Sequence, residues 1–340
     1  MLDAIVYIGR FQPLTLSHIK IIKKALESAK KVIVIVGSAK NARNTHDPWT
    51  EDERIEMLKS VRQINTNRIC FAPLQNSNYE FSWWLSEVQK IVEGNTVQNS
   101  KIGIIGYKKD ETGYYLDYFP QWEFIEISHL YDRGLSATQI REKLFCGNDL
   151  DGTPDEVCLW LNDWIISNRD IYENLKGEFF YIKDYKKMWA ASPFAPVFVT
   201  ADALVLCKKN ILLIQRKNNP GKNLYALPGG FLEQRESLAD CAVRELKEET
   251  QIVVDISTLK NSISLTKVFD DPFRDLRGRF ITHAHVFNLN LENLPKIESS
   301  DDAGNVLWLP LSELDEFQNK FFSDHYRIIN NLLKALNIKK

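Results

Sequence analysis

The chain has 340 residues, of which 44% are hydrophobic and 26% charged, and its formal net charge is -2. This length is about twice that of a usual domain, so we expect two folded domains and exclude a disordered chain. The balanced charge argues against broad nucleic-acid binding, so anionic ligands must be held by local basic groups. The apolar runs are too short for a membrane span and no signal-like leader is present, which predicts a cytoplasmic protein without membrane attachment.

The first half of the chain alternates short β-branched runs with helical patterns. In chain order we expect a strand over 4–8, a helix over 16–28, a strand over 32–36, a helix over 50–61, strands over 102–105 and 123–127, and helices over 137–145 and 156–166. This alternation is typical of a parallel sheet with crossover helices. The sequence therefore predicts an α/β, Rossmann-like open sheet for the first domain.

The pattern changes near residues 192–196, where two prolines in Ser-Pro-Phe-Ala-Pro forbid a helix and precede a strand over 197–206. The rest of the chain is rich in strands and has one strong helical pattern, which indicates an α+β domain. We place the first domain at 1–185 and the second at 193–340. The five cysteines are odd in number and widely spaced, which favours reduced thiols over disulfides or a metal site.

The first candidate site lies where the first strand gives way to the first helix, over Ile8-Gly-Arg-Phe-Gln-Pro-Leu-Thr-Leu-Ser-His18. In an open parallel sheet this junction is the usual place for ligands. Gly9 would let the backbone approach a phosphate. Thr15 and His18 lie across the opening turn of the helix, where free N–H groups and the helix dipole attract anions. The arrangement suits a triphosphate.

A second motif begins another helix at Leu135-Ser-Ala-Thr-Gln-Ile-Arg141. Ser136 and Gln139 form a capping box, which is sufficient as a purely structural interpretation. The same helix start, with Ser136 and Thr138, is also suited to bind the β- and γ-phosphates of a nucleotide. Arg141, one turn further on, would then neutralise the charge that develops on pyrophosphate.

These two motifs resemble those of the nucleotidyltransferase superfamily, and the Gly-Arg-Phe-x-Pro spelling resembles its nicotinamide-mononucleotide (NMN) adenylyltransferases of archaeal type. Thr15 stands where the superfamily has the first histidine of a His-x-x-His pair. The resemblance implies in-line attack of NMN on the α-phosphate of ATP, giving NAD and pyrophosphate. It implies catalytic roles for Arg10, His18 and Arg141, ATP contacts for Gly9, Phe11, Thr15, Ser136 and Thr138, and Mg²⁺ held largely by ATP.

Three further segments resemble parts of the same family. Residues 48–54, Pro-Trp-Thr-Glu-Asp-Glu-Arg, resemble a loop of the family, although Thr50 and Glu53 are also an ordinary capping box. Residues 78–84 resemble the segment that stacks a tryptophan on the pyridine ring, and the spacing to Val88 favours Trp84 over Trp83; an aromatic face in the core is the alternative. Residues 106–110 resemble a substrate loop, with Tyr107 and Lys108 as ligand contacts; a solvated surface loop is the alternative.

The second candidate site is a run from Gly230 to Glu249 that resembles the Nudix box at every position before its last glycine. Glu245, Glu248 and Glu249 share one face of the predicted helix, and carboxylates at this density need cations such as Mg²⁺, with Mn²⁺ as the alternative. The resemblance implies that these three carboxylates and the Gly229 carbonyl hold metal. It also implies that Glu245 and Glu249 are catalytic, and we expect Arg244 to orient Glu236 or a ligand carboxylate.

Within the superfamily, residues 269–279 resemble a segment of the ADP-ribose pyrophosphatases, which implies that Arg274 and Arg277 bind substrate. Both arginines could equally pair with acids. Asp301-Asp302 and Asp324-His325 resemble later landmarks of that branch. Gln251 stands where the box ends in glycine, so we expect it to enter a left-handed conformation at a cost of about 1 kcal/mol.

The first interpretation is a bifunctional enzyme that makes NAD and splits ADP-ribose to AMP and ribose 5-phosphate. A second keeps the transferase but gives the Nudix domain a different role. The domain is then either a regulatory module that binds a metabolite or a hydrolase of another nucleoside diphosphate compound. In a third interpretation the transferase acts on another phosphate compound in place of NMN. Trp84 and the segment 9–11 argue against this interpretation. The expected small-molecule partners are ATP, NMN, NAD and ADP-ribose. Nucleic acid is not expected, and assembly into a homo-oligomer stays open.

Overall fold

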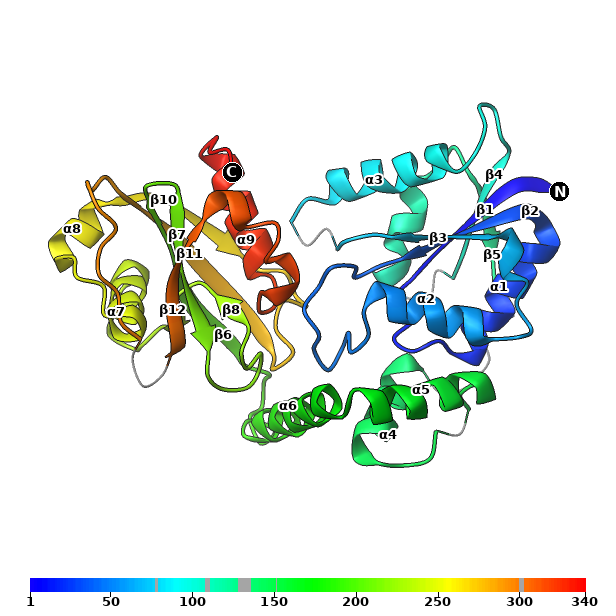
Figure 1. Cartoon of the computed structure of the whole chain (residues 1–340), viewed down its shortest axis with the longest axis horizontal. Helices are drawn as coiled ribbons and strands as arrows, with labels where there is room; N and C mark the ends of the chain where they lie inside the picture. Colours follow the sequence, from blue (N-terminus) through cyan, green and yellow to red (C-terminus); the bar gives the residue numbers. More distant parts are fainter. Residues whose placement is uncertain (77–78, 108–110, 128–135, 151, 300–302) are drawn as a thin grey trace. The chain divides into compact units, whose positions relative to one another are not determined.

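The computed structural model describes residues 1–76, 79–107, 111–127, 136–150, 152–299 and 303–340. The chain forms two units, Met1–Lys176 and Gly177–Lys340, and the division between them falls within one helix (Figure 1). The predicted limits of 1–185 and 193–340 lie on either side of the end of that helix. They stay a prediction for the exact domain boundaries.

The first unit contains a five-stranded sheet with the order β3-β2-β1-β4-β5. Its strands are β1 (Leu2–Gly9), β2 (Ala29–Val36), β3 (Ile69–Pro73), β4 (Ile102–Gly106) and β5 (Glu123–Glu126). All of its pairings are parallel, for example Ile5 opposite Val32 and Val6 opposite Ile104. The predicted Rossmann-like sheet is therefore confirmed, and β3 is a strand that the sequence patterns did not indicate.

Helices cover both faces of this sheet, because its central strands are apolar on both sides. Its helices are α1 (Leu16–Ser28), α2 (Glu51–Ser60), α3 (Phe81–Gly94), α4 (Ala137–Cys146), α5 (Asp155–Ser167) and the start of α6 (Arg169–Lys187). Val88 and Val92 of α3 pack with Val6 on one face. His18 of α1 contacts Tyr7 on the other, since neighbouring strand residues point to opposite faces. The predicted helix over 156–166 is α5, whereas α6 was not predicted.

The second unit is built on a mixed sheet with the order β10-β11-β6-β7-β12. Its strands are β6 (Val197–Cys207), β7 (Asn210–Arg216), β8 (Tyr225–Ala226), β9 (Gly229–Phe231), β10 (Ile263–Phe269), β11 (Arg279–Leu289) and β12 (Ala303–Pro310). β6 pairs in parallel with β11, and β9 pairs in antiparallel fashion with β6 next to the Nudix-box helix. The predicted strand over 197–206 and the α+β organisation are confirmed.

Three helices belong to the second unit in addition to the end of α6: α7 (Leu238–Thr250), α8 (Ile256–Asn261) and α9 (His325–Ala335). Figure 1 shows α7 and α9 on opposite sides of the sheet. α7 buries Cys241, Ala242 and Leu246 against the sheet, so its carboxylate-bearing face points elsewhere. Short 3-10 turns cover Thr66–Arg68, Glu111–Tyr118, Leu311–Glu313 and Gln318–Lys320.

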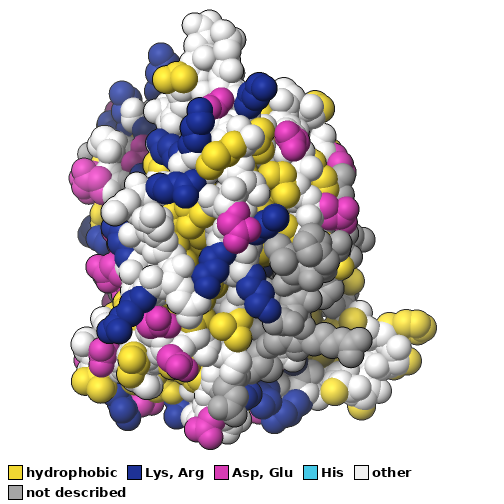
Figure 2. Space-filling view, turned by 90° about the vertical axis from the view of Figure 1, so that its right-hand side faces the viewer, with side chains coloured by type: hydrophobic (Ala, Val, Ile, Leu, Met, Phe, Trp, Pro, Cys, Tyr) yellow, Lys and Arg dark blue, Asp and Glu magenta, His cyan; other side chains and the backbone are white. Residues whose placement is uncertain are grey.

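The surface of the described chain is mixed in charge. On the face drawn in Figure 2, Lys and Arg side chains are interspersed with acidic and hydrophobic ones. Among the helices that the structure describes, none is both long and apolar enough to cross a membrane. The ligand-binding chemistry must therefore be looked for in local clusters of side chains.

Candidate active sites

The loop between β1 and α1 is held in place by a buried arginine. Arg54 of α2 has no exposed surface, and its guanidinium donates to the carbonyls of Arg10 (2.7 Å), Gly37 (2.6 Å) and Ser38 (3.3 Å). Gln12 and Trp49 add a reciprocal pair of hydrogen bonds between side-chain amide and backbone. A buried charge that is fully used by backbone carbonyls has a structural role, so Arg54 fixes the loop that carries Arg10.

His18 lies in the first turn of α1 and is held by the helix cap. The Thr15 backbone N–H donates to His18 Nδ1 at 3.0 Å, while the His18 N–H donates to Thr15 Oγ1 at 3.4 Å. Because Nδ1 accepts, the neutral ring carries its proton on Nε2. Burial lowers the pKa of His18 to about 4. His18 is thus a neutral imidazole near pH 7, with Nε2–H as its donor.

Gly9 and Phe11 support the site, because they pack against each other and Phe11 also packs against His18. A Cβ on Gly9 would lie 2.7 Å from the Phe11 ring, so glycine is needed there to admit that ring. Phe11 is 1% exposed, has a φ of 52°, and meets the rings of His18 at 5.1 Å and Tyr7 at 5.6 Å. The Phe11 side chain therefore packs under His18, and any contact of Phe11 with ATP would be through its backbone.

Arg10 is exposed at the mouth of this loop. Its Nη1 donates to His46 Nε2 at 2.7 Å, and His46 Nδ1 lies 3.4 Å from Asp47 Oδ2. Burial opposes ionisation of Asp47, but the hydrogen bond from His46 and the charges of Arg10 and Arg54 leave its pKa below the usual value. Sequence reasoning did not single out His46 or Asp47, which lie outside the two motifs.

Tertiary structure brings the second motif against the first. Arg141 of α4 is 6% exposed; its Nη1 donates to the Gln12 carbonyl and its Nη2 donates to Thr138 Oγ1 at 3.2 Å. Its Nε is buried without a hydrogen-bond partner in the described part of the chain. Burial lowers the pKa of Arg141 to about 10, so the guanidinium stays charged near pH 7. Ser136 caps α4 with Gln139, as predicted.

The segment 48–54 has the structural role that its capping box predicts. Thr50 and Glu53 cap α2 reciprocally. Glu53 also pairs with Arg43, whose Nη2 lies 2.9 Å from Oε1, and accepts from Trp164 Nε1 at 2.7 Å. The Glu53 oxygens are occupied by protein groups, so this residue has a structural role, and a ligand contact by the rest of the segment stays a prediction.

Trp84 and Trp83 have different surroundings on α3. Trp84 packs against the core beside the sheet, stacks on Phe81 at 5.9 Å and meets Tyr115 edge-on at 5.6 Å, whereas Trp83 is 39% exposed. Both interpretations of Trp84, a stacking platform and a core residue, are compatible with this partly buried position. Tyr107 follows β4 directly and is half-buried, and Lys108 lies outside the described residues.

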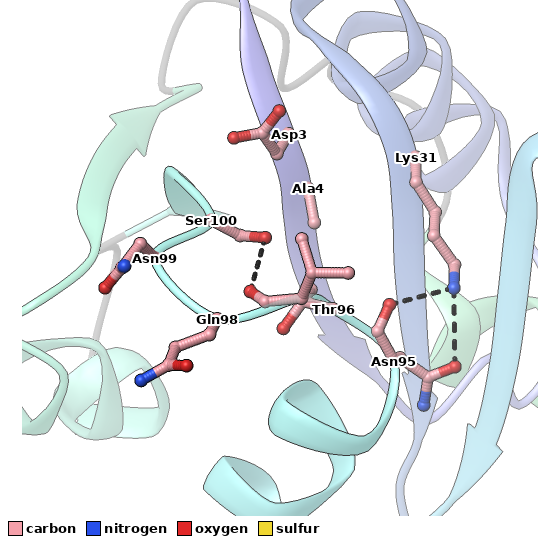
Figure 3. Close-up of a pocket in the computed structure, with 9 residues that line it drawn as sticks. Asp3, Ala4, Lys31, Asn95, Thr96, Gln98, Asn99 and Ser100 are labelled. Carbon is pink, nitrogen blue, oxygen red and sulfur yellow. Dashed lines mark hydrogen bonds between the residues drawn. The ribbon is translucent and has the colours of Figure 1, made fainter.

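A cavity of about 260 Å³ lies at the other end of the first sheet (Figure 3). Its walls come from the starts of β1 and β2 and from the turn after α3, away from the carboxyl ends of the strands where ligands bind. The only ammonium in its wall, Lys31 Nζ, donates to the carbonyl and side chain of Asn95 at 3.0 and 3.5 Å. These polar groups close the turn, so we assign no ligand to this cavity.

The second unit has a cavity of about 430 Å³ beside the Nudix-box helix. Glu249 reaches back to β9, where its Oε2 accepts the Gly229 N–H at 2.9 Å. Gly230 faces Glu245 so closely that a Cβ there would lie 2.3 Å from Oε1. Burial and the nearby charges of Glu245 and Asp202 raise the pKa of Glu249 to about 8, and burial also raises the pKa of Glu245.

Arg244 ties the carboxylates of this face together. It forms a two-point contact with Glu236, at 2.7 and 3.0 Å, and also lies 2.8 Å from Glu245 and 3.0 Å from Glu248. Of the two predicted partners of Arg244, Glu236 or a ligand carboxylate, the structure shows the contact with Glu236. In the described chain no three acidic, His or Cys side chains are gathered closely enough to enclose an ion.

Arg274 and Arg277 both line the cavity, and both are paired with acids. Arg274 makes a buried two-point pair with Asp324 at 3.1 Å, and Arg277 pairs with Asp275 at 2.7 and 3.0 Å. Pairing with acids is therefore confirmed for both arginines, and their binding of substrate stays a prediction that their place in the cavity wall allows.

Three further cavity residues were missed or left without a role. Asp202 of β6 is 5% exposed and accepts from Thr282 Oγ1 at 2.7 Å. Arg216 ends β7 and lies over the Phe322 ring at 4.2 Å. His325 accepts the Leu227 N–H on Nδ1, and burial lowers its pKa. A lone acid within an apolar strand, as at Asp202, is a signal that could have been used.

Gln251 ends α7 in the left-handed conformation that was predicted, with a φ of 44°. Its N–H donates to the Lys247 carbonyl, and Lys247 Nζ binds the Ile252 carbonyl beyond it. The helix end is thus well bonded despite the missing glycine.

Two family descriptions match separate parts of the chain: "Cytidylyltransferase-like" over residues 6–143 and "NUDIX domain" over residues 197–332. A nicotinamide/nicotinic acid mononucleotide adenylyltransferase of Acinetobacter baylyi is 32% identical over 179 residues, covering 52% of this chain and 93% of that protein. An ADP-ribose pyrophosphatase of Methanocaldococcus jannaschii is 36% identical over 139 residues, covering 41% of this chain and 75% of that protein.

One solved structure matches both units together. It is the crystal structure of a bifunctional NMN adenylyltransferase/ADP ribose pyrophosphatase from Francisella tularensis, complexed with AMP and a manganese ion. It is 35% identical, has a TM-score of 0.92, and the match covers 98% of this chain and 99% of that one. The present chain therefore belongs to the family of bifunctional NMN adenylyltransferase/ADP-ribose pyrophosphatases.

Proposed function

We propose that the first unit transfers the adenylyl group of ATP to NMN, giving NAD and pyrophosphate. The observation that carries this proposal is the approach of Arg141 to the β1–α1 loop, where it joins Arg10 and His18. A site of two guanidinium groups and an Nε2–H donor suits the phosphates of ATP.

The reaction needs no covalent intermediate, because the mononucleotide phosphate attacks the α-phosphate directly as the bond to pyrophosphate breaks. We assign charge neutralisation on the leaving pyrophosphate to Arg10 and Arg141, and a hydrogen bond to a phosphate oxygen to His18. The N-termini of α1 and α4, which Thr15 and Ser136 cap, supply backbone N–H donors, and Thr138 lies in the first turn of α4. Trp84 is our proposed platform for the pyridine ring.

The second unit, in this proposal, hydrolyses ADP-ribose to AMP and ribose 5-phosphate. Water adds to a phosphorus atom and the bridging P–O bond of the pyrophosphate breaks. The residues fit a divalent cation, because burial and mutual repulsion disfavour ionisation of Glu245 and Glu249, and a cation would remove that penalty. Mg²⁺ or Mn²⁺ would be held by Glu245, Glu248, Glu249 and the Gly229 carbonyl.

When bound, such a cation supplies charge neutralisation for the pyrophosphate and lowers the pKa of water. Arg244 keeps Glu236, Glu245 and Glu248 oriented until ligands bind. Arg274 and Arg277 are our proposed contacts for the substrate phosphates. Glu245 and Glu249 are the proposed catalytic carboxylates.

Product analysis of the purified chain tests both halves of the proposal. One reaction contains ATP with NMN or with nicotinate mononucleotide, and the other contains ADP-ribose with Mg²⁺ or Mn²⁺. We expect a dinucleotide and pyrophosphate from the first, and AMP with ribose 5-phosphate from the second. If ADP-ribose binds in a calorimeter but is not split with either metal, the second unit is a regulatory module and the hydrolase proposal is wrong.

A further inference from the structure

The last part of α6 is attached to the second unit by specific contacts. Glu178 is buried, and its Oε2 accepts the Gly221 N–H at 2.8 Å. Ile182, one turn further on, is also buried. Residues 177–187 therefore form part of the folded hydrolase unit, although the sequence indicated no such role for them.

Tyr185 lies behind an arginine of the hydrolase cavity. The Arg277 guanidinium is 5.5 Å from the Tyr185 ring centroid and 4.6 Å from that of Phe280. Arg277 and Phe280 line the cavity, but Tyr185 does not. The guanidinium is thus held by two aromatic rings and by the carboxylate of Asp275, which restricts both its position and its plane.

The Tyr185 ring is itself fixed by neighbouring aromatic residues. Trp189 meets it edge-on at 4.3 Å and also contacts Phe198 of β6 at 4.8 Å. Phe198 contacts Phe280 at 4.8 Å, and the two residues are paired in register across β6 and β11. A continuous set of rings therefore joins α6 to the wall of the cavity.

Simple apolar anchoring of α6 is the alternative explanation for these rings. Anchoring alone would require buried apolar surface but no cation, and Ile182 already provides such surface. A tyrosine ring against Arg277 adds an attraction that depends on the aromatic face. That attraction acts on a residue that faces the cavity, so its loss should be felt in substrate binding.

We propose that Tyr185 is a positioning residue of the hydrolase site, which holds Arg277 ready for the phosphates of the substrate. The end of α6 is then part of the hydrolase machinery. This inference rests on the proposed hydrolysis of ADP-ribose. It predicts that the aromatic ring of Tyr185 matters and that its hydroxyl does not.

Steady-state kinetics of ADP-ribose hydrolysis by the full chain test the proposal with three variants. Tyr185→Leu keeps apolar bulk but removes the aromatic face, and Tyr185→Phe keeps the face without the hydroxyl. Phe180→Leu is the matched control, because Phe180 lies on the same helix and is 38% exposed. Adenylyl transfer and the thermal unfolding of each variant are measured in parallel.

For Tyr185→Leu we expect KM for ADP-ribose to rise by about threefold to tenfold while kcat stays within about twofold. Tyr185→Phe and Phe180→Leu should match the parent chain. An unchanged KM in Tyr185→Leu, or an equal loss in Tyr185→Phe, would overturn the proposal, as would a fall in kcat alone. If the parent chain itself does not hydrolyse ADP-ribose, the proposed function fails and the inference fails with it.

Discussion

The two sites of this chain differ in the sign of their unbalanced charge. In the first, Arg10, Arg54 and Arg141 gather around one buried carboxylate, Asp47. In the second, burial and the nearby charges of Glu245 and Asp202 raise the pKa of Glu249. The first site therefore suits an anionic nucleotide with the cations that it already has, whereas the second, as we propose, needs an added cation. One chain can thus present two kinds of phosphate site, one built from arginines and the other from carboxylates that need a cation.

The largest effect is expected at the second site, from Glu249→Gln. The change removes a charge where the attraction for metal and the stabilisation of attacking hydroxide are both electrostatic. We expect hydrolysis of ADP-ribose to fall by about 10² to 10³-fold. Adenylyl transfer, measured on the same preparation, should persist. Equal loss of both activities in a folded variant would show that the sites are not separate.

The corresponding experiment at the first site is His18→Ala. Loss of the Nε2–H donor and of the link to the Thr15 N–H should lower adenylyl transfer by about 10²-fold. Hydrolysis of ADP-ribose is the internal control and should be retained. A variant that transfers adenylyl groups at the parent rate would remove His18 from the machinery.

The opposite electrostatics also predict opposite pH slopes of stability. His18 has a pKa of about 4 in the folded chain and about 6.5 in the unfolded chain, so the unfolded state binds more protons between these pH values. The contribution of His18 to the free energy of unfolding is therefore lost as pH falls from 6.5 to 4. Glu249 has a pKa of about 8 in the folded chain, above the ordinary value of 4.5 for a glutamate. Without divalent cations, the folded state binds more protons there, and stability is lost as pH rises from 4.5 to 8.

Thermal or chemical unfolding of His18→Asn and Glu249→Gln, each against the parent chain, measures these slopes. The difference in free energy of unfolding between each variant and the parent chain should change by at most about 1.4 kcal/mol for each pH unit between the folded and unfolded pKa values of the residue. Addition of Mn²⁺ should reduce the Glu249 slope and leave the His18 slope alone. Slopes of the same sign at both sites would contradict the comparison.

A smaller effect is expected from Trp84→Ala. If Trp84 stacks on the pyridine ring, KM for the mononucleotide should rise by roughly threefold to tenfold while KM for ATP changes less. Trp83→Ala is the matched control, because Trp83 is exposed on the same turn of α3. Equal effects on the two substrates, or unfolding of the Trp84 variant, would favour the core interpretation.

The smallest effect should come from Gln251→Gly at the end of α7. A φ of 44° suits glycine better than glutamine, so the free energy of unfolding should rise by about 1 kcal/mol or stay unchanged. Hydrolysis should change little, because the carboxylates precede the cap. A large change in kcat would show that the strained helix end reaches the site.

The sequence by itself determined the local elements that carry both sites. Thr50 and Ser136 could be identified as helix caps, and Gln251 as a left-handed end, because these conformations depend on residues within one helical turn. The alternation of patterns likewise predicted the parallel sheet. β3 escaped prediction because a short strand at the edge of the sheet has a weak periodic signal, whereas α6 was missed although its pattern is clearly amphipathic.

Only the tertiary structure decided which residues meet. Arg141 reaches the Gln12 carbonyl across 129 residues of chain, and Asp202 of β6 lies near enough to Glu249 of α7 for its charge to act on that carboxylate. It also gave Phe11 and Arg54 supporting positions, and paired Arg274 and Arg277 with acids. Such contacts arise from the packing of helices and strands far apart in the chain. Burial and nearby charge then set the pKa values of His18 and Glu249, which no local pattern specifies.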